Sequence, residues 1–263
     1  MKNNVTIMPC VMFALFFSIG SVSAQAVDAE VIIDRSRNRI QADTTSTRSR
    51  MVLAAKDGTA SERVMDQYSK DGPKGHRKII VFQRPASVAN TRFLTLENPG
   101  ANDDQWIFLP SLGKVRRIAS SEGSNSFMGS DLSYDDLSAM DRDANLDTHR
   151  IIREESIAGN LCYVIESISK DNTFQYSKMI QYIDKSTYVN HKAELFDRRG
   201  TLVKILEMSE LKDVQGRLTP MVTKMTTLSA GTSTSIIVDI IKYDDPIPEG
   251  VFTTSYLETG RAR

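Results

Sequence analysis

DDQWIFLPSLGKVRRIASSEGSNSFMGSDLSYDDLS, residues 103–138, contains the one tryptophan of the chain, and the predicted fold is organised around this segment. Residues 105–109 have the composition of a short strand, and the segment PSLG after them predicts a tight turn. The chain then returns as a second strand over residues 114–118, which makes a hairpin. Trp106 and Phe108 are two residues apart in the first strand, so we expect both side chains on one face of it.

A loop and a helix follow this hairpin. Residues 119–125 are polar, and we expect them to be mobile. Phe127 and Met128 lie between Ser and Gly with no local strand to pack against, which favours an exposed apolar flap; burial in a core is the alternative. Ser133 precedes acidic residues, a pattern that predicts an N-cap and a helix over residues 133–140.

An aromatic strand face followed by a flap and a short helix predicts a pocket with a lid. A flap predicts that replacing Phe127 and Met128 weakens ligand binding at little cost in stability, whereas core positions predict a large stability loss. The residues expected to form the apolar cavity and its lid are Trp106, Phe108, Phe127, Met128, Leu132, Tyr134, Leu137 and Met140. The basic residues of the second strand either steer an anionic headgroup or form an ordinary solvated face: Lys114, Arg116 and Arg117.

The rest of the chain has the pattern of a long antiparallel sheet with few helices, which must curl or close rather than stay flat. Residues 105–109 and 179–183 are apolar on both faces, so one face lines a cavity or both are buried. We expect strands at residues 42–49, 48–56, 63–69, 77–84, 91–97, 149–157, 161–170, 179–184, 189–196, 201–213, 218–228 and 233–243, and helices at 26–37 and in the last dozen residues. The fold class is therefore α+β and mostly antiparallel β, with one domain over residues 25–263.

The first 24 residues have the features of a secretory signal peptide: a basic start, a short apolar run, and small residues up to Ala24. We expect cleavage after Ala24, with Ala26 as the alternative site. The apolar run is too short for a comfortable membrane span. A lipid anchor on Cys10 is disfavoured, because Ile, Met and Pro precede that residue. The sequence thus predicts an exported protein without a transmembrane segment in the mature chain.

The mature chain would retain Cys162 as its one cysteine, which excludes an internal disulfide and favours a small core residue over a reactive thiol. Residues 1–24 contain one basic residue and no acidic one, so cleavage leaves a formal charge of −1. A near-neutral chain lacks the positive charge that nucleic-acid binding requires.

The sequence contains no G-x-S-x-G elbow, P-loop, H-E-x-x-H motif or dinucleotide fingerprint. His76, His149 and His191 are far apart in sequence and lack neighbours at zinc-site spacing. Residues 141–147 imitate half of a calcium loop, but Leu146 occupies the glycine position. Acidic pairs stand at turns or helix starts, where carboxylates accept backbone hydrogen bonds. We therefore expect no catalytic residue, no metal and no cofactor.

Three segments of the chain, DDQWIFLP, LGKVRRI and SFMGSDLSYDDLS, resemble the signature of bacterial outer-membrane lipoprotein-sorting-like proteins, a family related to the periplasmic lipoprotein carrier LolA. Weaker similarity extends from about Val27 to the segment PIPEGVFT. The resemblance implies a curved half-barrel, that is, an incomplete β-barrel, with short helices plugging its mouth as a lid.

Such a resemblance implies a periplasmic carrier or chaperone that binds the acyl chains of a lipoprotein or lipid. The implied partners are envelope lipids or lipoproteins and an inner-membrane transporter of the resistance-nodulation-division (RND) type. The alternative is an envelope sensor or interaction module that recognises lipoproteins and regulates a membrane partner.

Overall fold

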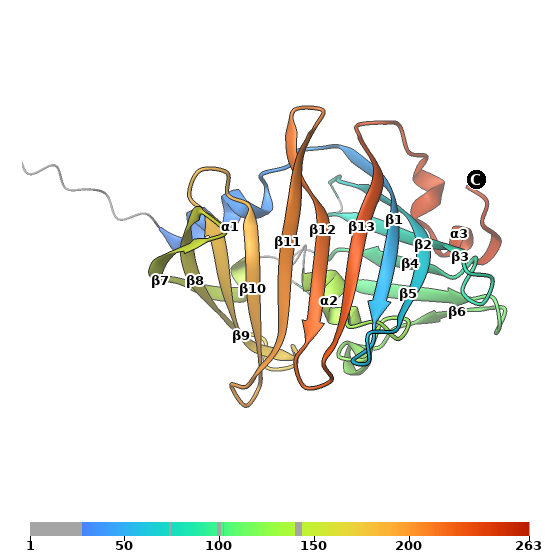
Figure 1. Cartoon of the computed structure of the whole chain (residues 1–263). Coiled ribbons are helices and arrows are strands. Elements are labelled where there is room, and N and C mark those ends of the chain that lie inside the picture. Colours follow the sequence, from blue (N-terminus) through green and yellow to red (C-terminus); the bar gives the residue numbers. More distant parts are fainter. Residues whose placement is uncertain (1–27, 74, 99–100, 102, 140–143, 263) are drawn as a thin grey trace, which may run out of the picture.

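The computed structural model describes residues 28–262 except 74, 99–100, 102 and 140–143, and its main feature is one sheet of thirteen antiparallel strands (Figure 1). The elements in chain order are α1 (Ala29–Arg37), β1 (Thr44–Ala54), β2 (Ala60–Lys70), β3 (Arg77–Arg84), β4 (Arg92–Leu96), β5 (Asp104–Leu109), β6 (Lys114–Arg117), η1 (Ser120–Glu122), α2 (Tyr134–Ala139), η2 (Ala144–Leu146), β7 (Asp147–Ile157), β8 (Asn160–Ser169), β9 (Tyr176–Asp184), β10 (Asn190–Asp197), β11 (Leu202–Val214), β12 (Arg217–Thr227), β13 (Thr232–Tyr243), η3 (Glu249–Phe252) and α3 (Thr254–Thr259).

The strands build two arms that meet in the middle of the sheet. Strands β1 to β6 pair in sequence along one arm, and β7 to β13 pair in sequence along the other. The last strand β13 then pairs with the first strand β1, with Met51 opposite Ile236. Between the arms, the chain crosses from edge strand β6 to edge strand β7 through η1, α2 and η2.

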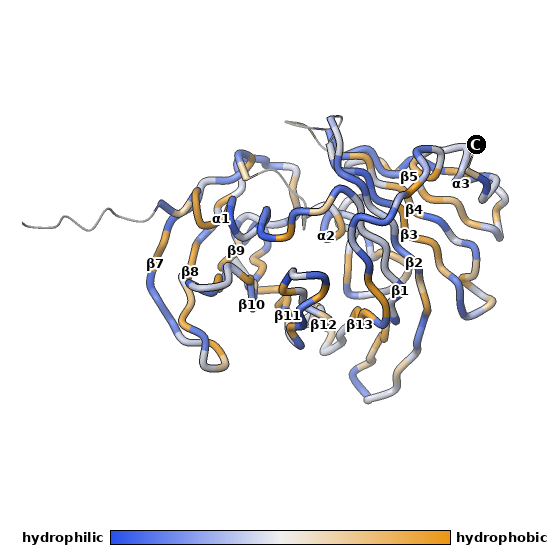
Figure 2. The backbone as a smooth tube through the Cα atoms, turned by 90° about the horizontal axis from the view of Figure 1, so that it is seen from above, coloured by the Kyte–Doolittle hydropathy of each residue, from blue (hydrophilic) through white to orange (hydrophobic). Residues whose placement is uncertain are grey.

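The sheet is curved into an open trough, and α2 lies inside it (Figure 2). Its edges β6 and β7 do not pair with each other, so the barrel stays incomplete. A right-handed twist accumulated over many strands makes such a sheet curl. The predicted class, a mostly antiparallel, curved half-barrel with few short helices, is confirmed.

Apolar clusters lie on both faces of the sheet. The largest one fills the concave side and includes the side chains of Met51, Phe82, Phe93, Phe127, Leu132, Tyr134, Leu137, Leu195 and Met225. On the convex side, η3 and α3 cover part of β3 to β6, where Leu94, Phe252 and Leu257 are buried. Helix α1 packs Ile32 and Ile33 against Ile165 and Ile183 at the other arm.

The predicted secondary structure agrees with most of these elements. Predicted strands at residues 42–49 and 48–56 are one continuous strand, β1. The helix predicted at 133–140 is α2, and the one at 26–37 is α1, whose N-cap Asp28 accepts a hydrogen bond from the Glu30 N–H. The predicted signal peptide lies outside the described residues. Among the described helices, none is both long and apolar enough to cross a membrane.

Candidate functional site

The loop that leads into α2 is folded onto the concave cluster. The Phe127 N–H donates to the Leu132 carbonyl at 2.7 Å, which closes a tight turn and directs the Phe127 ring inward. That ring is 0% exposed and has its centroid 5.0 Å from Phe93 and 5.8 Å from Phe82. The predicted exposed flap is therefore wrong for Phe127, because the curvature of the sheet supplies the packing partners that the local sequence lacks.

Polar contacts fasten this loop to two central strands. Arg63 of β2 donates to the Met128 carbonyl at 2.5 Å. The Asp131 carboxylate accepts from the hydroxyls of Thr232 at 2.5 Å and Thr234 at 2.8 Å on β13. Met128 itself is only partly buried and packs against the edge of the cluster.

Helix α2 starts at a reciprocal cap and is bonded to the arm formed by β7 to β13. The Asp136 N–H donates to Ser133 Oγ at 3.1 Å, and the Ser133 N–H donates to Asp136 Oδ2 at 2.7 Å, as the predicted N-cap requires. Asp136 also accepts from the Tyr176 hydroxyl at 2.7 Å and forms a 2.6 Å ion pair with Lys204 Nζ. Burial, with the nearby Asp136 carboxylate second, holds the pKa of Tyr176 well above its usual range. The tyrosine is therefore a fixed hydrogen-bond donor to α2.

The opposite arm is hydrogen-bonded to the same helix along its length. Lys78 Nζ of β3 donates to the Leu137 carbonyl at 3.0 Å, and Lys78 is buried. Gln105 Nε2 of β5 donates to the Tyr134 carbonyl at 3.1 Å and to Ser138 Oγ at 2.8 Å. Helix α2 thus bridges the trough and is hydrogen-bonded to both of its walls.

One cavity, the α1-side cavity, lies between α1, strands β9 to β12 and α2, and has a volume of about 210 Å³. Its apolar wall is formed by Ile33, Ile40, Met179, Ala193, Leu195, Leu206, Met208 and Met225. Arg37 and Arg39 line it beside α1, and His149, Gln181 and Asn190 add polar groups. Asn190 Oδ1 is buried and makes no hydrogen bond with the described residues.

A second cavity, the β1-side cavity, lies across α2, and its volume is about 200 Å³. Its lining comes from β1, β2, β3, β13 and α2, and includes Met51, Met65, Ile80, Leu137 and Ile236. The two cavities share no lining residue, and α2 contributes Asp136 to the first and Leu137 to the second. A polar rim cavity of about 420 Å³ shares Arg37 and Ile40 with the first cavity and His76 with the second.

Both cavities contain methionines in their walls. Met179, Met208 and Met225 line the α1-side cavity, and Met51 and Met65 line the β1-side cavity. Thioether side chains are flexible and polarisable, so they adapt to apolar partners of different shape. These concave walls are therefore suited to a flexible apolar ligand.

The residues predicted to form one cavity lie on two faces of the sheet. Phe127, Leu132, Tyr134 and Leu137 come together in the concave cluster. Trp106 and Phe108 do share a strand face, but it is the convex one, where they pack with Val115, Val251 and Tyr256. Their placement beside the lid was wrong because the C-terminal segment, far away in sequence, covers that face. Met140 lies outside the described residues.

The basic residues of β6 are at the edge of the sheet. Arg116 pairs with Glu122 at 2.6 Å, and Arg117 pairs with Asp104. Lys114 is exposed near the hairpin turn. These pairings favour the solvated-face alternative, and a headgroup role for the three residues stays a prediction.

The three histidines do not come together. The His149 ring is hydrogen-bonded to Ser167 Oγ at 2.7 Å and to the Ala144 carbonyl at 3.1 Å. His76 pairs with Asp71 at 2.6 Å, and His191 lies 3.6 Å from Asp184. Hydrogen bonds from Ser186 and Thr187 outweigh the effect of burial and lower the pKa of Asp184 to about 2.

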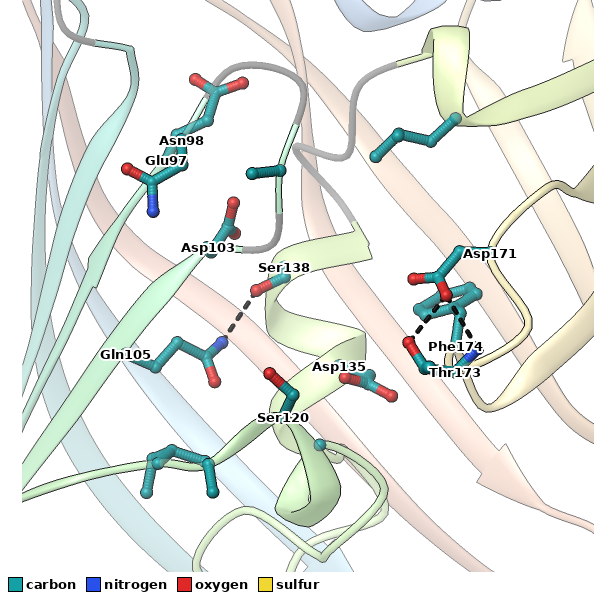
Figure 3. A pocket seen from close by; sticks show the side chains of 15 residues that line it. Glu97, Asn98, Asp103, Gln105, Ser120, Asp135, Ser138, Asp171, Thr173 and Phe174 are labelled. Carbon is teal, nitrogen blue, oxygen red and sulfur yellow. Dashed lines mark hydrogen bonds between the residues drawn. The ribbon is translucent and has the colours of Figure 1, made fainter.

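A further small cavity of about 70 Å³ opens beside α2 between β5 and the segment before β9 (Figure 3). Its lining includes Glu97, Asp103, Asp135 and Asp171, and Asp171 accepts two 2.7 Å hydrogen bonds from Thr173. This volume holds a few water molecules, and the acidic lining is unsuited to an acyl chain.

Comparison with known proteins assigns the chain to a family. A family model described as an uncharacterized protein matches residues 74–259, which is more than half of the chain. The chain belongs to the family that this model describes. No curated protein matches the sequence.

Several solved structures are similar to this chain over most of its length. A domain from Vibrio parahaemolyticus that is assigned to outer membrane lipoprotein sorting has 27% identity and a TM-score of 0.82, with 88% of this chain and 98% of that chain covered. A DUF1329 family protein from Desulfovibrio piger has 29% identity and a TM-score of 0.83, covering 87% and 97%. A LolA superfamily protein from Nitrosomonas europaea, at 22% identity and a TM-score of 0.71 over 88% and 100%, shares the fold.

The cavity walls of this LolA-like chain were largely missed in the sequence. Leu195, Leu206 and Met225 stand in strands with an ordinary alternating pattern, and nothing local marks their face as a cavity. One signal did exist: residues 179–183 are apolar on both faces, and Met179 lines the α1-side cavity while Ile180 is buried on the convex side.

Proposed function

We propose that the protein is a periplasmic carrier that binds the acyl chains of a lipid or lipoprotein in the trough. The observation that carries this proposal is the pair of methionine-lined cavities on either side of α2. The fold shared with a LolA superfamily protein and the similarity to a lipoprotein-sorting domain support it. Export by a signal peptide and delivery to an RND-type transporter belong to the same proposal.

Burial of methylene groups supplies the affinity. Each buried methylene contributes roughly 0.8 kcal/mol, so a 16-carbon chain gains up to about 12 kcal/mol before the costs of association and ordering. No catalytic group is needed for this role.

The volumes imply that α2 moves when a long chain enters. An apolar cavity of about 150 Å³ holds a molecule the size of benzene. Cavities of about 210 and 200 Å³ are therefore too small for a complete long chain while α2 stays in place. Moving α2 breaks the hydrogen bond that Asp136 of the helix accepts, and the bonds that Lys78 and Gln105 donate to helix carbonyls. These bonds set the free-energy cost of the movement.

The first experiment is mass spectrometry of an organic extract from protein that was exported into a periplasm and purified without detergent. We expect stoichiometric phospholipid or acylated peptide. A protein that carries none and also fails to bind a fluorescent fatty acid would contradict the carrier, and would favour the sensor or interaction module.

A matched pair of variants on β11 tests where the chain binds. Leu206 lines the α1-side cavity, and its neighbour Ile205 points to the other face of the strand and is half-buried too. We expect Leu206→Gln to weaken fatty-acid binding at least tenfold and Ile205→Gln to leave it within twofold. Equal effects of the two variants would show that the concave wall is not the binding surface.

A further inference from the structure

Arg39 is a cation in the wall of the α1-side cavity, and no ion pair joins it to a carboxylate of the described residues, although Asp136 and Asp147 also line that cavity. It follows α1, lines the α1-side cavity, and donates from Nη1 to the Leu218 carbonyl at 2.5 Å. Within the described part of the chain it forms no ion pair, and its electrostatic neighbour is the phenol of Tyr243. Burial lowers the pKa of the Arg39 guanidinium.

Within the described part of the chain, Arg39 donates one hydrogen bond, from Nη1, so its other N–H groups are available to a ligand. A guanidinium carries five N–H donors in a planar fork that matches carboxylate and phosphate groups, and a half-buried charge without a counter-ion is unfavourable. Lys204 differs because it is neutralised by Asp136, which lines this cavity. Arg39 therefore has both the geometry and the electrostatic reason to receive an anion.

The lining of this cavity combines polar and apolar side chains. Arg39 lies in the linker between α1 and β1, and its hydrogen bond to the Leu218 carbonyl places it at the start of β12. Arg37 lines both this cavity and the polar rim cavity. Leu206 and Met225 lie farther along β11 and β12 and form the apolar wall. A cation and an apolar wall in one cavity suit a molecule with a charged head and an acyl tail.

We infer that the α1-side cavity takes an amphiphile whose anionic group, a carboxylate or a phosphate, binds Arg39 while its acyl chain packs on Leu206 and Met225. The inference rests on the proposed function and specifies the chemistry of the ligand. A free fatty acid and a phosphate-bearing lipid both offer this chemistry.

The test compares three ligands with the same twelve-carbon chain: laurate, dodecyl phosphate and the neutral dodecanol. Site-specific dissociation constants come from the methyl NMR signals of Met179, Met208 and Met225, which line this cavity. We expect at least one anion to bind about tenfold more tightly than dodecanol, since charge-assisted hydrogen bonds are the stronger ones. The tighter of the two anions identifies the headgroup class.

Variants of Arg39 then assign the preference to this side chain. Arg39→Gln should reduce the anion preference to less than threefold with dodecanol affinity unchanged, and Arg39→Lys should retain most of it. Arg92→Gln is the matched control, because Arg92 is a half-buried arginine that also donates to a backbone carbonyl, that of Leu257, on the convex face. Thermal unfolding verifies that each variant is folded.

The outcomes separate the two proposals. Equal affinities of the wild-type protein for all three ligands, or an anion preference that persists in Arg39→Gln, overturn the Arg39 assignment and leave acyl binding intact. Absence of any methyl shift with all three ligands overturns acyl binding in this cavity as well.

Discussion

At the scale of single residues, Phe127 has the environment that most affects stability. Its ring contacts Phe82, Phe93 and Tyr134 and has no exposed surface. Replacement by Ala leaves a cavity among these rings, and we expect the free energy of unfolding to fall by about 3–5 kcal/mol. Urea denaturation followed by the fluorescence of Trp106, the one tryptophan, measures this loss.

Met128 is the control for that variant, because the neighbouring side chain is only partly buried. Met128→Ala should lower the free energy of unfolding clearly less than Phe127→Ala. If Phe127→Ala lowers the free energy of unfolding by less than about 1 kcal/mol and weakens lipid binding, the exposed flap that the local sequence favoured is supported instead.

At the scale of elements, local patterns were sufficient for the hairpin of β5 and β6 and for the start of α2. A Pro-Gly turn and a Ser N-cap act within a few residues, so the sequence displays them directly. Local patterns did not show which segments cover each face of the sheet. Trp106 and Phe108 are partly covered by η3 and α3, which lie about 150 residues later, and no local spacing reports that contact.

The attachment of α2 to the wall of the trough gives an element-scale prediction. Tyr176→Phe removes the hydroxyl that donates to Asp136 and keeps the ring, so α2 should open more easily. We expect about tenfold faster amide hydrogen exchange in α2 and faster uptake of a fluorescent fatty acid. The control is Tyr182→Phe, because the Tyr182 hydroxyl donates to Glu194 on the convex face at 3.2 Å. Unchanged exchange in α2 would show that the Tyr176 bond does not limit its movement.

At the scale of the whole molecule, the pairing of β1 with β13 decides the architecture. It joins residues about 190 positions apart, and it brings the two arms together under α2. Alternating strands predict a curved antiparallel sheet, but they do not specify which strands become edges or where the trough opens. The two cavities exist because the arms are joined in this order, and their walls were therefore the part that sequence reasoning could not place.

The arrangement of the two cavities predicts how many acyl chains the molecule holds. They have nearly equal volumes of about 210 and 200 Å³, lie on opposite sides of α2, and share no lining residue. We therefore expect one chain on each side of α2 once the helix has moved to admit them. Met208→Trp on β11 and Ile236→Trp on β13 place an indole into one cavity each, at positions that are only partly buried and so tolerate added volume.

Native mass spectrometry with palmitate counts the bound chains directly. The wild-type protein should bind two palmitates, each single variant one, and the double variant none, while a two-chain phospholipid loses affinity in both single variants. If either indole alone abolishes all palmitate binding, a single chain threads beneath α2 through both cavities, and the trough acts as one site rather than two.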